Sequence, residues 1–313
     1  MRWPAAACLL TAVAVLAAGC GGSEQSDDAA GTTTPTETTA PAATETLEDL
    51  WRAPGEDVAV VPGTSDHKVG VNRISFLVVD KQGALVERPT ARVWVAHGLK
   101  QAPFAETTAR LEPIGVPGGE SAGVGGIYVT RITTPTAGKY WIMAEPVGGR
   151  KIQALGNVVV ARKSAAPSVG DRAIPSKTPT LASTGGDMSA LTTSRHPDRA
   201  LYRTSVAQAM AAKRPFVVAF ATPQYCQTRT CGPTVDVVSA VRKAQPASSD
   251  VDFIHVEIYQ DNDPAKGVNR WVKQWRLPTE PFTFVVDGNG VIRSKLEGAF
   301  SVDELKQAVA AVR

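Results

Sequence analysis

The chain has 313 residues, of which 43% are hydrophobic and 20% are charged, and its formal net charge is +3 at pH 7. This length is enough for two ordinary domains, and the composition is that of a soluble globular protein. The small net charge comes without a basic run or a stacking motif, so we expect no nucleic acid among the partners.

Residues 1–19 have the pattern of a secretory signal. Arg2 supplies one positive charge, and the segment Ala5–Ala18 that follows contains no charged residue. This apolar segment is too short for a membrane-spanning helix, and small residues before Cys20 predict a cleavage point. Cys20 directly after Ala17-Ala18-Gly19 resembles the lipobox of bacterial lipoproteins. The resemblance implies that Cys20 is lipidated and anchors the chain at the extracytoplasmic face of the cell membrane. An ordinary secretory signal with an incidental cysteine is the alternative.

Residues 20–50 predict a disordered tether. The segment Gly21–Asp49 is rich in Thr, Ala, Ser and Pro, and holds seven acidic residues and no basic one. Such a segment buries too little apolar surface to order itself. With Cys8 removed and Cys20 acylated, Cys226 and Cys231 remain as thiols, which are expected to pair in an oxidising compartment.

Residues 51–161 predict an all-β domain, because short strand patterns alternate with turn signals and no ten-residue stretch has helical periodicity. Several strands at this spacing are typical of an antiparallel sandwich. The segment Thr136-Ala-Gly-Lys-Tyr140 resembles the tyrosine corner of immunoglobulin-like domains, which implies an immunoglobulin-like β-sandwich. His67 and His97 are expected at the surface or in loops. Strands are expected at 72–79, 91–96, 127–132, 139–144 and 158–160.

Residues 162–197 predict a linker, because they are poor in large apolar side chains and contain several Pro, Ser, Thr and Gly. A linker of this composition lets two domains reorient independently.

Residues 198–313 alternate between helical and strand patterns and predict an α/β domain. The run Phe216–Phe220 is apolar throughout, as expected for a strand buried on both faces. Ser205 and Ser301 are each followed three residues later by Gln or Glu, which predicts capping boxes. Further strands are expected at 251–258, 282–286 and 291–296, and helices at 205–212, 233–243, 264–276 and after 301, with Trp271 and Trp275 in the core and His255 buried and hydrogen-bonded.

Three local motifs resemble the thioredoxin family in residues 200–313. Cys231-Gly232-Pro233 resembles the first three residues of the family's Cys-Gly-Pro-Cys motif. Pro281, directly before a strand, resembles the proline that thioredoxins hold cis beside the active thiols, and Gly298–Ser301 is similar to the segment that opens the last helix. The resemblance implies a thioredoxin-like fold, and the arrangement with a lipid tether and a β domain resembles actinobacterial envelope proteins of this family.

The resemblance implies thiol–disulfide exchange through Cys226 and Cys231. Thr234 stands where the family has its second cysteine, so Cys226 is the partner at a C-x4-C spacing. A helix that starts near Pro233 places Cys231 at the positive end of the helix dipole, and Arg229 adds charge, which predicts a lowered pKa for Cys231. We take Cys231 as the attacking thiol and leave the reverse order open.

The remaining site residues follow from the same resemblance. Gly232, Pro233 and Thr234 would support the thiol pair, while Pro281 and Glu280 would face an extended substrate segment. The expected partners are envelope proteins with thiols or disulfides, or small thiols, and no cofactor is expected.

Two alternatives remain open for the cysteine pair. The first is a structural disulfide, which over so short a loop would stabilise the fold by only about 2 kcal/mol. In that case the protein would be a lipoprotein that binds a partner and has no catalytic role. Metal binding requires at least one further soft ligand, and no histidine follows His255, so no metal is predicted.

Overall fold

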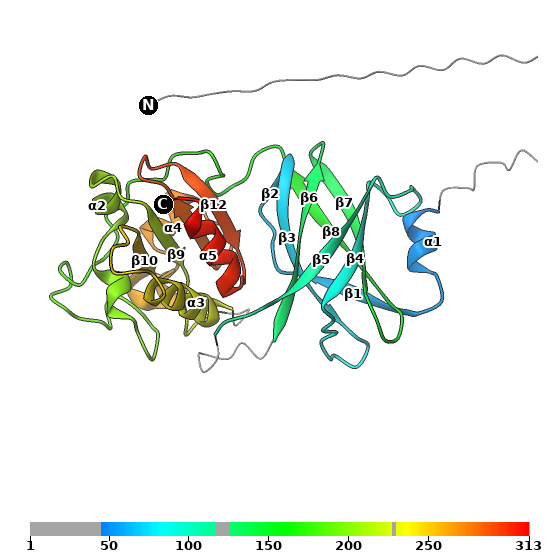
Figure 1. Cartoon of the computed structure of the whole chain (residues 1–313), viewed down its shortest axis with the longest axis horizontal. Helices are drawn as coiled ribbons and strands as arrows, with labels where there is room; N and C mark the ends of the chain where they lie inside the picture. Colours follow the sequence, from blue (N-terminus) through cyan, green and yellow to red (C-terminus); the bar gives the residue numbers. More distant parts are fainter. Residues whose placement is uncertain (1–44, 117–124, 227–229, 313) are drawn as a thin grey trace, which may run out of the picture. The chain divides into compact units, whose positions relative to one another are not determined.

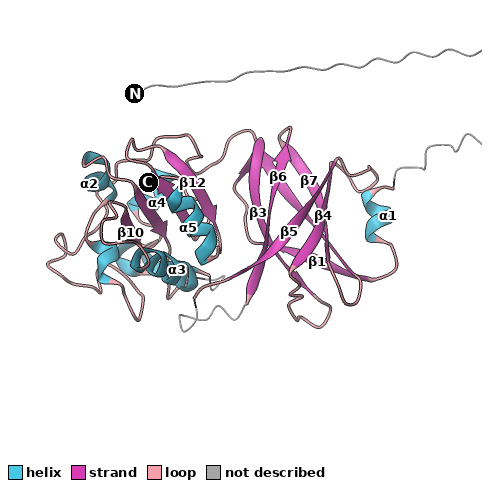
Figure 2. Ribbon diagram, in the orientation of Figure 1, coloured by secondary structure: helices cyan, strands magenta, loops and turns pink. Residues whose placement is uncertain are grey.

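The computed structural model describes residues 45–116, 125–226 and 230–312, which belong to one compact unit. In it, an all-β half precedes a half that mixes helices and strands (Figures 1 and 2). Cys20, most of the predicted tether and Arg229 lie outside the described residues. Of the helices within those ranges, none is both long and apolar enough to cross a bilayer.

Seven strands of the all-β half close into a barrel. Their order is β1-β3-β6-β5-β4-β7-β8, and a parallel pairing of β1 with β8 closes the sheet, while the short strand β2 adds to β8. Closure removes the free edges that an open sheet would present. The bounds are β1 Glu56–Pro62, β2 His67–Lys68, β3 Gly70–Val79, β4 Thr90–Ala96, β5 Ala105–Pro113, β6 Gly126–Thr134, β7 Gly138–Pro146 and β8 Ile152–Ala161.

The predicted immunoglobulin-like sandwich is therefore wrong. The decisive contact is the register of β1 on β8, which runs from Glu56 beside Ile152 to Ala59 beside Leu155. Alternation of apolar and polar residues is the same in a sandwich strand and in a barrel strand, so it does not distinguish them. The bonds of the tyrosine corner do form, since Tyr140 Oη donates to the Thr136 carbonyl at 2.8 Å. In this protein the tyrosine corner therefore belongs to a barrel and does not indicate a sandwich.

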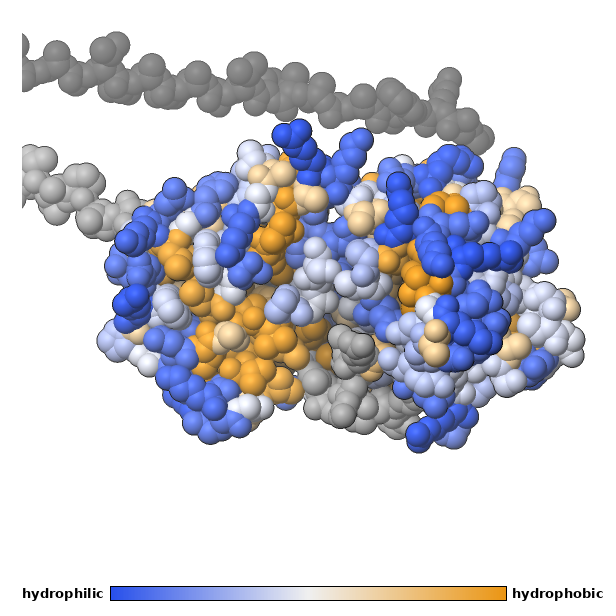
Figure 3. Space-filling model, turned by 180° about the vertical axis from the view of Figure 1, so that it is seen from behind, coloured by the Kyte–Doolittle hydropathy of each residue, from blue (hydrophilic) through white to orange (hydrophobic). Residues whose placement is uncertain are grey.

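Side chains fill the interior of the barrel. Phe76 and Tyr128 stack with their ring centroids 5.4 Å apart, and the Tyr128 hydroxyl donates to the Val86 carbonyl. Outside the barrel, Leu47 of the short helix α1 (Leu47–Trp51) packs with Trp94 in a separate apolar cluster. The face of the barrel seen from behind shows hydrophobic residues bordered by hydrophilic ones (Figure 3).

The second half is a small mixed α/β region around a four-stranded sheet of order β10-β9-β11-β12. Strands β9 and β10 are parallel, and β11 is antiparallel to both β9 and β12. The bounds are β9 Phe216–Phe220, β10 Asp252–Val256, β11 Phe282–Val286 and β12 Ile292–Glu297, with helices α2 Val206–Ala211, α3 Cys231–Lys243, α4 Arg270–Trp275 and α5 Val302–Ala310 and 3₁₀ turns η1 Arg199–Tyr202, η2 Gln260–Asn262 and η3 Pro264–Lys266.

Strand β9 is buried on both faces, as its unbroken apolar run predicted. Val217 and Ala219 share one hydrophobic cluster with residues of α3 and α5. Phe216, Val218 and Phe220 share another cluster with residues of α2 and α4. Because successive side chains of a strand point to opposite faces, helices cover both faces of the sheet.

The segment predicted as a linker packs onto the α/β half. Ala173 and Leu191 are buried in its two hydrophobic clusters. The backbone of the segment bonds to the start of β12, where the Gly170 amide donates to the Ile292 carbonyl. Trp275 Nε1 donates to Ser176 Oγ at 3.0 Å. The composition predicted a linker because large apolar residues are few in the segment. Several of its small polar residues are instead buried and hydrogen-bonded, as Ser176 and Thr178 are.

Candidate functional site

Cys226 and Cys231 lie beyond the carboxyl end of β9, Cys226 in the connection to α3 and Cys231 at the first residue of that helix. Helix α3 begins at Cys231, two residues before the predicted start. Gly232, Pro233 and Thr234 form its first turn and are all buried. Proline is tolerated in a first turn because the missing N–H has no partner within the helix.

The two thiols differ in exposure. Cys231 has no exposed surface, whereas Cys226 is half-buried. Their sulfur atoms and a carboxylate oxygen of Glu280 all lie within 4.8 Å of one another. The fold thus brings the predicted cysteine pair together and adds a carboxyl group from the segment before β11.

Burial raises the pKa of the Cys231 thiol, and the neighbouring Cys226 and Glu280 act in the same direction. A hydrogen bond with the backbone of Thr222 opposes this shift. The predicted lowering of this pKa is therefore wrong. A helix N-terminus stabilises a charge by about 0.3–1 kcal/mol at an exposed position, and the loss of water around a fully buried thiolate outweighs that.

Glu280 precedes Pro281, and the peptide bond between them is cis, as the resemblance implied. Burial raises the pKa of Glu280 to about 7, with further contributions from Cys226 and Glu257. Its Oε2 atom is buried and has no hydrogen-bond partner among the described residues. From the resemblance to thioredoxins, this side chain was predicted to face substrate. The structure also places it beside both sulfur atoms.

Glu257 and Thr193 belong to the site and were missed as site residues from the sequence. The Thr193 amide and hydroxyl donate to Glu257 Oε1 at 2.6 and 2.8 Å. The same hydroxyl accepts from the Gln224 amide at 3.1 Å, two residues before Cys226. Thr193 thereby connects the carboxylate to the loop that carries the half-buried thiol. Thr193 was missed because it lies in the segment predicted as a linker.

His255 has the buried, hydrogen-bonded state that was predicted. Its Nδ1 lies 2.7 Å from Tyr202 Oη and its Nε2 lies 3.0 Å from the Ala221 carbonyl oxygen. Burial lowers the pKa of this ring. His97 is exposed, but His67 is only 3% exposed and contacts Thr64, so its predicted surface position is wrong.

The all-β half also reaches the site, through the connection between β5 and β6. A Cβ atom on Gly115 would lie 3.3 Å from the Pro233 Cβ atom. Val116 packs against the hydrophobic cluster that contains Cys231. The first turn of α3 is thus covered from the barrel side.

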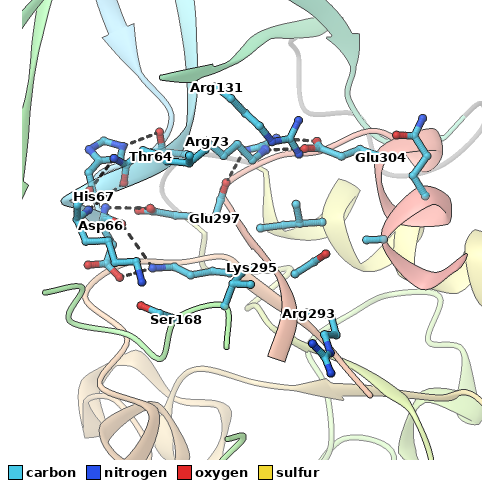
Figure 4. A pocket seen from close by; sticks show the side chains of 18 of the residues that line it. Thr64, Asp66, His67, Arg73, Arg131, Ser168, Arg293, Lys295, Glu297 and Glu304 are labelled. Atoms are coloured by element: carbon cyan, nitrogen blue, oxygen red, sulfur yellow. Dashed lines mark hydrogen bonds and ion pairs between the residues drawn. The ribbon is translucent and has the colours of Figure 1, made fainter. Parts of the chain in front are cut away.

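A pocket of about 480 Å³ lies elsewhere, between the barrel strands β2 and β3 and the elements β12 and α5 (Figure 4). Two ion pairs cross it. Lys295 Nζ lies 2.6 Å from Asp66 Oδ2, and Arg73 Nε lies 2.7 Å from Glu304 Oε1. Glu297 accepts from the Asp66 amide at 2.9 Å. These ion pairs join the two halves of the chain. The groups able to react with a substrate or a metal ion lie at the thiol pair and not in this pocket.

Comparison of the chain with protein-family models and with curated proteins found no match to either. The chemistry available at the site is that of two adjacent sulfur atoms and one carboxyl group. Two adjacent thiols form and break a disulfide reversibly, and thiolates with a carboxylate bind metal ions.

Proposed function

We propose that this protein exchanges thiols and disulfides at the extracytoplasmic face of a cell membrane, anchored by lipid on Cys20. The observation that carries the proposal is the contact between a half-buried thiol, Cys226, and a fully buried one, Cys231. The proposal includes membership of the thioredoxin-like family. The strand order of the α/β half and the Cys231-Gly232-Pro233 turn support that membership.

The difference in exposure between the two thiols supports an order of attack. In the first step Cys226, as a thiolate, attacks one sulfur of a substrate disulfide, and the second substrate sulfur leaves as a thiolate that takes up a proton. In the second step Cys231 loses its proton and attacks the Cys226 sulfur, which releases the first substrate sulfur. Two electrons pass from the protein dithiol to the substrate, and oxidised protein runs the same steps in reverse. This order reverses the one favoured from the sequence, because a sulfur without exposed surface cannot meet a substrate first.

The surroundings of Cys226 suit a protein or small-molecule disulfide. Tyr225 is 38% exposed, and its ring centroid lies 6.3 Å from that of Tyr259. These rings form a rim beside the thiol, and Glu280 lies next to both sulfur atoms. Pro281 follows Glu280 and is buried. Disulfide-containing envelope proteins and small thiols are therefore the proposed partners.

Trapping tests the proposal on the chain that begins after Cys20. We expect reduced wild-type protein to reduce the disulfides of insulin, and Cys231→Ser to accumulate a mixed disulfide through Cys226. Cys226→Ser is the matched variant and should trap none. A protein disulfide that resists both glutathione and reduced thioredoxin would show an inert bridge and a non-catalytic role. A mixed disulfide that accumulates only in Cys226→Ser would show that Cys231 attacks first.

A further inference from the structure

Three groups that bind metal ions converge at the thiol pair. The Sγ atoms of Cys226 and Cys231 and a carboxylate oxygen of Glu280 lie within 4.8 Å of one another. Zn–S bonds are about 2.3 Å long, so two sulfur atoms on one tetrahedral Zn²⁺ are about 3.8 Å apart. The three ligand atoms therefore fit around a single ion with small side-chain movements.

The orphaned oxygen of Glu280 is a second, independent observation. Its Oε2 atom is buried and has no hydrogen-bond partner in the described part of the chain. Buried polar atoms of this kind are rare and call for an explanation. A divalent cation between the three groups would give this oxygen a partner and would favour the charged form of each group.

The backbone on both sides of Glu280 is held in place. Thr279 Oγ1 donates to Glu297 Oε1 at 2.9 Å, and the Gly298 amide donates to the Pro281 carbonyl at 2.9 Å. These bonds tie the segment to the end of β12. The direction of the Glu280 side chain toward the sulfur atoms is thus supported by its neighbours, as metal ligands require.

We propose that the reduced protein binds one Zn²⁺ ion through Cys226, Cys231 and Glu280. Thiolates select soft or borderline ions, and a carboxylate oxygen is a regular ligand of Zn²⁺ but a poor one for Cu⁺. Each thiol releases its proton as its sulfur bonds to the ion, and no oxidant or reductant takes part. Three protein ligands leave a fourth position for water or a small thiol, as in zinc sites that exchange ligands.

Zinc binding and disulfide formation exclude each other at this site, because both use the same two sulfur atoms. The ion would hold the pair reduced and keep it from exchange until a chelator or a competing thiol removes the metal. The zinc site does not depend on the proposed exchange activity. It requires only the geometry of the three side chains.

Co²⁺ is the probe that tests the site, since it substitutes for Zn²⁺ and reports thiolate ligands by absorption. We expect the reduced chain lacking residues 1–20 to bind one equivalent of Co²⁺, with a thiolate-to-metal band and the visible bands of a tetrahedral ion. One equivalent of Zn²⁺ should remove these bands. The oxidised chain should show none.

Substitutions of the three ligands distinguish specific binding of the metal ion from nonspecific attraction to nearby negative charge. Cys226→Ser and Cys231→Ser should abolish the thiolate band, and Glu280→Gln should weaken binding by at least about tenfold. Asp261→Asn is the matched control, since its carboxylate is 60% exposed and lies outside the ligand group, and it should change affinity by less than about threefold.

Two results would overturn the zinc site. One is the absence of Co²⁺ bands while both thiols react with a thiol reagent. The other is unchanged affinity in Glu280→Gln, which would leave two sulfur ligands only. Insulin reduction is measured in parallel with a chelator present, so a failure of exchange is recorded separately from a failure of metal binding.

Discussion

Burial decides what each titratable side chain near the thiol pair can do. Cys231 lies without exposed surface and Cys226 at a half-buried rim, which makes Cys226 the group that a substrate meets. His255 is buried between Tyr202 and the Ala221 carbonyl. Its neutral ring bridges the 3₁₀ turn η1 and the end of β9, and its role is to support the sheet beside the site.

The pH dependence of stability should report the buried His255 ring. Its pKa is lowered in the folded chain, so below about pH 6.5 the unfolded chain binds a proton that the folded chain refuses, and stability falls as pH falls. In His255→Gln this contribution is absent. We expect the stability advantage of wild type over His255→Gln, measured by urea denaturation, to be smaller at pH 5.5 than at pH 8.

His97→Gln, at an exposed ring, is the matched control and should keep the wild-type dependence. A stability advantage over His255→Gln that stays constant between the two pH values would contradict the assigned role of His255.

At the scale of elements, the connection from β5 to β6 covers the first turn of α3. Gly115 has φ +78° and lies close to Pro233, while Gly83 has φ +82° and nothing within 4 Å of the position that its Cβ would take. The two glycines therefore share the same backbone requirement and differ only in contact with the α/β half.

Alanine at these two glycines separates strain from contact. Both substitutions should destabilise the chain by about 1–2 kcal/mol because a Cβ atom is unfavourable in the left-handed region. Gly115→Ala should cost about 1 kcal/mol more, since its Cβ would press on Pro233. Urea denaturation measures the difference. Equal losses would show that Pro233 moves aside freely.

At the scale of the whole molecule, ion pairs join the barrel to the α/β half. The Arg73 and Glu304 side chains are 8% and 14% exposed, and Arg73 also donates to the carbonyls of Glu297 and Ala299. Glu304 follows the N-cap Ser301 of α5, so its predicted position in the first turn of a helix is correct. Its carboxylate pairs with Arg73 of the barrel, whereas the predicted capping box would have turned it back to the Ser301 amide.

Removal of Glu304 should weaken the junction between the halves. Glu304→Ala leaves the Arg73 charge largely buried without its partner, which should cost about 3 kcal/mol. Glu106→Ala removes the partner of Arg92 in a pair that is 50–51% exposed and should cost less than about 1 kcal/mol. Urea denaturation gives both values.

Hydrogen exchange in β4 and β9 would show whether the two halves then open separately. A loss in Glu304→Ala no larger than that in Glu106→Ala would mean that the ion pair contributes little to the junction.

Local pattern alone determined much of the α/β half. The strands Phe216–Phe220 and Phe282–Val286 have the predicted bounds, and Ser205 forms the predicted capping box with Gln208. The contact between Cys226 and Cys231 was also predictable, because a short loop before a helix keeps two such residues near each other. Each of these features depends on residues within a few positions of one another.

Long-range pairing was decided only by the tertiary structure. The parallel contact of β1 with β8 turned the expected sandwich into a barrel, and the fold brought Glu280 and Thr193 to the thiol loop. Alternating side chains show that a strand has a buried face, but they do not specify which edge it meets or which distant carboxyl group faces its end. Those choices depend on how buried surfaces fit together across the whole chain. The same packing removes Cys231 from water and raises the pKa of its thiol, although its position at a helix N-terminus predicted a lower pKa.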